Sequence, residues 1–212
     1  MKKKILVACL CVALAVLTIA GTTLAYLTSK DEVTNTFTVG NVQIKLDEAK
    51  ANADGTLVAN ADRVKANSYK LIPGHTYNKD PMVTVLEGSE SSYIKMTVTF
   101  SKAAELDAIF APTGADMTSI FNGYDSTNWI YKGNTKDTTA NTRTYEFWYK
   151  ETVAAPDADV ALDALFDQIK VPGTITGEQL ETIEGMTITV NAYAIQADGF
   201  ANAEAAWAAD IA

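Results

Sequence analysis

Cysteine and histidine are nearly missing from this sequence. Cys9 and Cys11 both lie in an apolar run near the start, and His75 is the single histidine. If that run is removed, the rest of the chain has no disulfide, no thiolate metal site and no cysteine nucleophile. One histidine also excludes zinc sites with two histidine ligands, such as the H-E-x-x-H pair of a metallopeptidase.

Other signatures of enzymes are missing as well. The sequence has no glycine-rich phosphate loop and no G-x-S-x-G elbow, so a Ser-His-Asp site using His75 has no supporting motif. Carboxylates are abundant enough for a glycosidase pair, yet nothing singles out two of them. Asn52, Asp54 and Asp62 lack the calcium-loop spacing, and Asp54-Gly55 is typical of a turn. We predict no catalytic residue, cofactor or metal, and we interpret His75 as a solvated turn residue.

Acidic residues dominate the charge. The full chain has a formal net charge of −9, and removing Lys2, Lys3 and Lys4 with the first segment leaves 14 basic and 26 acidic residues, or −12. Such a chain repels nucleic acid and anionic lipid headgroups. We therefore expect no nucleic-acid partner.

The first 25 residues have the features of an export signal. Three lysines precede a nearly unbroken apolar stretch over residues 5–20, and small residues follow. Thr23 and Ala25 fit the two small-residue pockets of a signal peptidase, which predicts cleavage before Tyr26. The alternative is a retained anchor, but the run is short for a span of about 20 residues. We predict a secreted protein that contacts a membrane only through its uncleaved signal peptide.

Period-two alternation is the main structural signal in the remaining chain. In residues 93–100 apolar side chains alternate with Lys95, Thr97 and Thr99, which indicates a half-buried antiparallel strand. Further strands are predicted at residues 36–48 (with a bulge or turn at Gly40-Asn41), 69–72, 82–86, 128–132, 143–153 and 186–196.

Three helices are predicted among these strands. They cover residues 102–110 with Ser101 as N-cap, residues 156–169 with Asp157 or Asp159 as cap, and residues 202–211 with Asn202 as cap. Many strands with few helices predict one mainly β domain, an antiparallel sandwich over residues 38–212.

Aromatic residues cluster late in the sequence and allow two interpretations. They could form an exposed sugar-binding platform, or one set could be buried under each packed layer, which we prefer. The cluster consists of Trp129, Tyr131, Tyr145, Phe147, Trp148 and Tyr149.

Three blocks carry a resemblance to a known family. Residues 25–40 read AYLTSKDEVTNTFTVG, residues 71–74 read LIPG and precede Lys79-Asp80-Pro81, and a strand-like segment at 186–196 precedes Gly199-Phe200. These blocks resemble the TasA/camelysin family of secreted proteins from Gram-positive bacteria. Residues 101–183 match no motif of that family.

The resemblance implies a jelly-roll sandwich, cleavage by a SipW-type signal peptidase, and assembly into biofilm matrix fibres, alone or with related matrix proteins. The resemblance also suggests a metallopeptidase, because camelysin-type proteins have been classed as metallopeptidases. The single histidine argues against this activity. In the family's fibre-formers, the segment freed by cleavage inserts as a strand into the next subunit.

The corresponding donor here is the extended segment of residues 26–37. Leu27, Val33 and Phe37 share one phase of a strand and are its candidate anchors, while the intervening Lys30-Asp31-Glu32 keeps it soluble. The alternative is a frayed terminus. The predicted function is a head-to-tail fibre subunit, and the alternative is a monomeric secreted adhesin or carbohydrate-binding sandwich.

Overall fold

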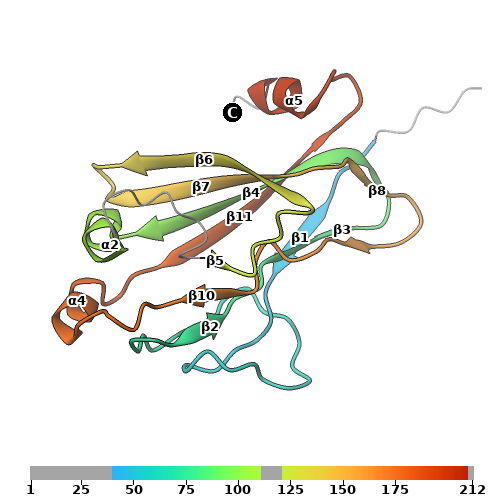
Figure 1. The fold of residues 1–212 in the computed structure, drawn as a ribbon. Helices are drawn as coiled ribbons and strands as arrows, with labels where there is room; N and C mark the ends of the chain where they lie inside the picture. Colours follow the sequence, from blue (N-terminus) through green and yellow to red (C-terminus); the bar gives the residue numbers. More distant parts are fainter. Residues whose placement is uncertain (1–39, 111–120, 210–212) are drawn as a thin grey trace, which may run out of the picture. The chain divides into compact units, whose positions relative to one another are not determined.

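The computed structural model describes residues 40–110 and 121–209, which lie within one compact unit, residues 39–212. This unit is mainly β, with antiparallel sheets and a few short helices (Figure 1). The predicted fold class is confirmed at that level.

The largest sheet contains four long strands in the order β11 (Ile188–Gln196), β4 (Ser89–Ser101), β7 (Thr142–Tyr149) and β6 (Trp129–Asp137). The short β8 (Val153–Ala155) pairs with the start of β4. The alternation predicted for residues 93–100 is confirmed, because Ile94, Met96, Val98 and Phe100 are buried while the residues between them are partly exposed. We call the buried side of this sheet its inner face and the other side its outer face.

Two three-stranded sheets complete the strand set. One has the order β1 (Ile44–Asp47), β3 (Met82–Val85) and β9 (Val160–Ala161). The other has the order β2 (Thr76–Asn78), β10 (Gln168–Lys170) and β5 (Phe121–Asn122).

The hydrophobic core joins the inner face of the large sheet to the smaller sheets. Met96 and Phe147 from the large sheet cluster with Val83 of β3 and Phe121 of β5, all nearly inaccessible to solvent. Phe121 also contacts the ring of Phe166 with centroids 4.6 Å apart. The arrangement is therefore sandwich-like, with apolar side chains between two β layers.

The three described helices differ from expectation mainly at their starts. α2 (Ala103–Phe110) and α5 (Ala203–Ala209) confirm two predicted helices, and Asn202 caps α5 through its Oδ1, which accepts from the Ala205 N–H at 2.9 Å. Ser101 does not cap α2, because it is the last residue of β4. The cap comes from Asn141, whose Oδ1 accepts from the Ala104 N–H at 2.9 Å.

The third helix, α4 (Gly177–Thr182), was not predicted. Its capping box was nevertheless readable in the sequence, because Thr176 and Gln179 are spaced as such a box requires.

The predicted helix at residues 156–169 is wrong. The segment runs extended beside β3 as β9 and continues into β10, and the Leu162 and Leu165 N–H groups donate to the carbonyls of Val83 and Pro81. The core buries Leu162, Leu165, Phe166 and Ile169, whereas Ala161 of the expected helical stripe is exposed. Tertiary pairing with β3 thus outweighs the helical spacing of the apolar residues.

Two further expectations about strands need correction. Residues 69–72 form no strand, because the Ile72 N–H donates to the Tyr77 hydroxyl at 2.7 Å instead of to a ladder partner. β6 is longer than expected and reaches Asp137, and an irregularity in its pairing with β7 lies between Tyr131 and Gly133. Lys132 is the extra residue there, so Thr135 returns to the outer face.

Candidate functional site

A groove of about 1120 Å³ opens between the end of β1 and the start of β11. Both strands lie at the edge of their sheets in the part of the chain that the structure describes. Edge strands carry backbone N–H and C=O groups that have no ladder partner on one side. The outer side of β1 is already partly used, because Glu48 exchanges backbone hydrogen bonds with Val64 and the Leu46 carbonyl accepts from Lys65 Nζ. The groove therefore combines a cavity with the edge of β11, which can pair with an added strand.

The lining of the groove is apolar along its middle. Ile188 and Val190 of β11 turn their half-buried side chains to the inner side, next to Phe100 of β4. Further apolar lining residues are Leu46, Tyr69, Leu71, Leu106, Ile183 and Met186. Residues 186, 188 and 190 are spaced by two, which is the spacing at which an added extended strand presents side chains to one face.

Tyr145 of β7 also lines the groove. Burial raises the pKa of its hydroxyl to about 12, because the apolar surroundings disfavour the charged phenolate. The middle of the groove therefore suits apolar side chains rather than a charged ligand.

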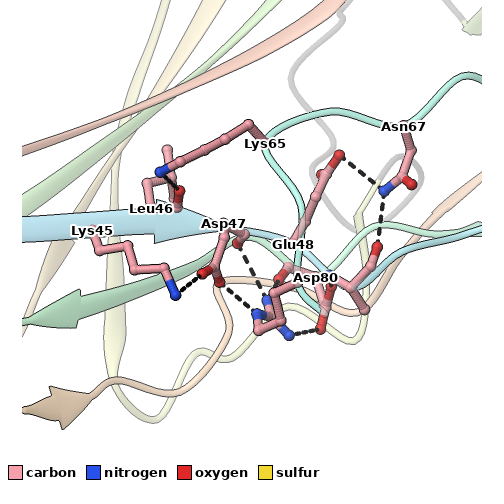
Figure 2. A network of polar contacts seen from close by, with 9 residues as sticks. Lys45, Leu46, Asp47, Glu48, Lys65, Asn67 and Asp80 are labelled. Atoms are coloured by element: carbon pink, nitrogen blue, oxygen red, sulfur yellow. Dashed lines mark hydrogen bonds and ion pairs between the residues drawn. The ribbon is translucent and has the colours of Figure 1, made fainter. Parts of the chain in front are cut away.

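Residues 65–71 of the long segment 49–75 form one wall, and a network of polar contacts holds this segment (Figure 2). Arg63 is its centre: Nε donates to Asp47 Oδ1 at 2.5 Å, and Nη1 donates to Asp80 Oδ2 at 2.8 Å. Nη2 donates to the backbone carbonyl of Asp80 at 2.8 Å. One guanidinium thus ties the wall to the end of β1 and to the residues before β3.

The same end of β1 carries a buried ion pair. Lys79 Nζ lies 2.5 Å from Glu48 Oε2, and the two residues are only 7% and 5% exposed. The other Glu48 oxygen accepts from Asn67 Nδ2 at 3.1 Å. Figure 2 shows Asn67 reaching Glu48 from the wall segment. These polar contacts act together with the apolar packing of Tyr69 and Leu71 against the cluster around Tyr77.

Electrostatics favour the ionised carboxylates in this network. Burial alone would raise the pKa of Asp47, but hydrogen bonds from Lys45 and Arg63 outweigh it and lower that pKa. Asp47 is therefore held in its charged form by these hydrogen bonds.

A second ion cluster lies at the α2 end of the groove. Arg143 Nη2 donates to both carboxylate oxygens of Asp107, at 2.8 and 2.9 Å, and Lys136 Nζ lies 2.8 Å from the same group. Burial would raise the pKa of Asp107, but the hydrogen bonds from Lys136 and Arg143 lower it. The groove is thus apolar in its middle and flanked by fixed charges.

No family model, curated protein or solved structure matches this chain. The groove must therefore be interpreted from its own geometry. Among residues 40–110 and 121–209, no helix is both long and apolar enough to cross a membrane. Within the same ranges, no three His, Cys, Asp or Glu side chains gather as metal ligands would.

The site residues expected from the export signal and the donor segment lie outside the described residues. They are Thr23, Ala25 and Tyr26 at the cleavage site and Leu27, Val33 and Phe37 in the donor. His75 lies exposed after the Pro73-Gly74 turn, as expected. Asp54 forms a turn in which its Oδ1 accepts from the Thr56 N–H at 3.0 Å.

The aromatic cluster is split between the two faces of the large sheet. Trp129, Tyr145 and Phe147 are buried in the core, whereas Trp148 faces outward and its ring centroid lies 6.3 Å from that of Trp207 in α5. The expected burial is confirmed for the inner set, but the outer face carries only the partly exposed Trp148 rather than a second set. The groove itself was not predicted, although the spacing of Met186, Ile188 and Val190 indicated its apolar strand.

Proposed function

We propose that this protein is a secreted, non-enzymatic surface or matrix subunit that assembles head-to-tail into extracellular fibres. After cleavage before Tyr26, residues 26–37 of one subunit add as a strand in the groove of the next. The observation that carries the proposal is the apolar groove between the edge strands β1 and β11. A jelly-roll topology and a SipW-type peptidase are part of the same proposal.

The length of the donor fits this groove. Residues 26–37 are 12 residues and span about 40 Å when extended, whereas the nine residues of β11 span about 30 Å. The donor can therefore pair along the whole edge of β11 and still leave a connection to its own domain.

The side chains of the donor also fit the groove. Leu27, Val33 and Phe37 are separated by even numbers of residues, so all three point to one face of an extended strand. Burying each stabilises the complex by about 1.5–3 kcal/mol before the cost of association. A donor that inserts into the next subunit rather than its own makes a head-to-tail contact, which does not close on itself and propagates as a filament.

The decisive experiment compares the mature chain with a chain that starts at Thr38. We expect filaments from the mature chain in electron microscopy and a monomer from the shortened chain in sedimentation. A synthetic peptide of residues 26–37 should bind the shortened chain. Normal filaments from the shortened chain would refute strand donation.

Point variants on β11 locate the acceptor. Val190→Glu places a charge in the groove, and we expect it to abolish both peptide binding and filaments. Asn191→Glu is the matched control, because residue 191 lies on the same strand but faces outward. Equal loss of assembly in the two variants would argue against the groove as the acceptor.

A monomeric adhesin or carbohydrate-binding module is the alternative. Its original support, the aromatic cluster, is weakened by the burial of Trp129, Tyr145 and Phe147. The edge-strand groove favours the fibre subunit.

A further inference from the structure

Four threonines stand in one line across the outer face of the large sheet. Thr135 of β6 pairs with Thr144 of β7, Thr144 with Thr99 of β4, and Thr99 with Thr189 of β11. The hydroxyls of Thr99 and Thr144 lie 2.9 Å apart. Such a line arises only because the bulge in β6 keeps Thr135 in phase with the other three strands.

Neutral polar side chains continue this pattern on both sides of the line. Thr97 and Asn191 are ladder partners on one side, and Ser101 and Thr142 are partners on the other, with the Thr187 N–H donating to Ser101 Oγ at 2.8 Å. We call the nine side chains together the threonine face: Thr97, Thr99, Ser101, Thr135, Thr142, Thr144, Thr187, Thr189 and Asn191.

A row that is apolar except for Lys95 borders the threonine face. Ile130, Trp148, Lys95 and Tyr193 are successive partners across β6, β7, β4 and β11. Trp207 of α5 covers the middle of this row, since Lys95 Nζ lies 4.3 Å from its ring centroid. Ile130 and Tyr193 at the two ends are each 42% exposed, which is high for large apolar side chains.

The charged groups on this face are engaged within the protein. Lys132 Nζ lies 4.0 Å from the ring centroid of Trp148, and Glu146 Oε1 accepts from Trp148 Nε1 at 2.6 Å. Asp137 Oδ1 accepts from two backbone N–H groups of the following turn. In a chain of net charge −9, this outer face therefore presents mostly uncharged hydroxyls.

We propose that the threonine face, with Tyr193 at its border, binds a neutral polysaccharide. Hydroxyls and an amide both donate and accept hydrogen bonds, which matches the hydroxyls of a sugar chain. Lys95 Nζ lies over the Tyr193 ring, 5.2 Å from its centroid, and the part of the ring that stays exposed offers an apolar surface beside them. A neutral polymer brings no charge toward an acidic protein, whereas a second copy or an anionic polymer does.

The size of the face also favours a polymer over a second copy. Across the strands, the face spans three spacings of about 4.8 Å. Along the strands, it spans three steps of two residues, each about 6.7 Å long, so its area is roughly 300 Å². A standard protein interface buries about 800 Å² on each partner around an apolar centre. The threonine face is smaller and polar at its centre, so it suits a single extended chain.

Affinity electrophoresis of the mature protein tests the proposal. Native gels would contain dextran, yeast mannan or a linear β-1,3-glucan as neutral probes, with alginate as the anionic comparison. We expect at least one neutral polysaccharide to retard the protein and alginate to have no effect. The double variant Tyr193→Ala/Asn191→Ala should bind at least tenfold more weakly, and Leu57→Ala, at an exposed loop residue, should bind normally.

Several results would overturn the proposal. They are no retardation by any neutral probe, equal retardation by alginate, or unchanged binding in the double variant. A dimer that the double variant abolishes, without any binding of polysaccharide, would assign the face to a second copy instead. Thermal melting establishes that the variants fold.

Discussion

The buried ion pair between Lys79 and Glu48 gives the sharpest test of how the groove wall is held. In Lys79→Met the Glu48 carboxylate loses its cation while it stays buried, with the Asn67 amide on its other oxygen. Breaking a buried pair in this way costs about 3–5 kcal/mol. Domains of this kind have unfolding free energies of about 5–15 kcal/mol, so the loss is a large fraction of the total.

Removing both charges should cost much less than removing one. We expect Glu48→Leu/Lys79→Met to be destabilised by no more than about 2 kcal/mol, because no uncompensated charge remains. The two single changes should therefore be non-additive by at least about 2 kcal/mol in a double-mutant cycle. Urea unfolding followed by tryptophan fluorescence measures all four proteins.

The control is a pair on the surface. Glu204 pairs with Lys132 at 3.3 Å and its side chain is 65% exposed, so Glu204→Gln should leave the urea midpoint unchanged. Additive effects of the Glu48 and Lys79 changes, within about 0.5 kcal/mol, would refute a coupled buried pair.

Three further predictions concern stability. Gly55→Ala should destabilise the protein by about 2–4 kcal/mol in urea unfolding, because φ is +87° and a Cβ would lie 2.7 Å from Tyr77 Cα. Gly88→Ala is the control: its φ is +81° but the space around it is open, so it should destabilise the protein by only about 1 kcal/mol. Asn141→Gly should lose about 1 kcal/mol with the cap of α2 while tolerating the positive φ of 53°, and an unchanged midpoint would exclude that cap. The lowered pKa values of Asp47 and Asp107 stabilise the fold above their unfolded value of about 3.9, so unfolding free energy should fall as pH drops below about 4; a flat profile down to pH 2 would contradict this.

Strongly alternating strands were predictable from the sequence, and segments whose conformation depends on distant partners were not. β4 and β11 are predictable from the sequence, because one face of each strand is apolar and the other is polar. Residues 156–169 carry apolar side chains at spacings that a helix also satisfies. The segment is extended because its backbone forms hydrogen bonds with β3, which the sequence does not reveal. Similarly, the cap of α2 comes from Asn141, which lies far along the sequence in the β6–β7 turn.

The candidate site was less predictable than the fold. The spacing of Met186, Ile188 and Val190 indicates one apolar face but does not say that the strand lies at a sheet edge. The sequence does not indicate the ion pairs of Arg63 and Lys79, because their acidic partners are 16 to 31 residues away. Long-range pairing of charges leaves no local pattern in a single sequence.

The extra residue at Lys132 links the two sides of the large sheet. If one residue were deleted there, the rest of β6 would turn over relative to β7. Asn134 would then lose its contact with Arg143, and Lys136 its contact with Asp107, at the end of the groove. Thr135 would point into the interior of the protein. Natural variants of this chain should therefore tolerate changes of residue type in the second half of β6 far better than changes in its length.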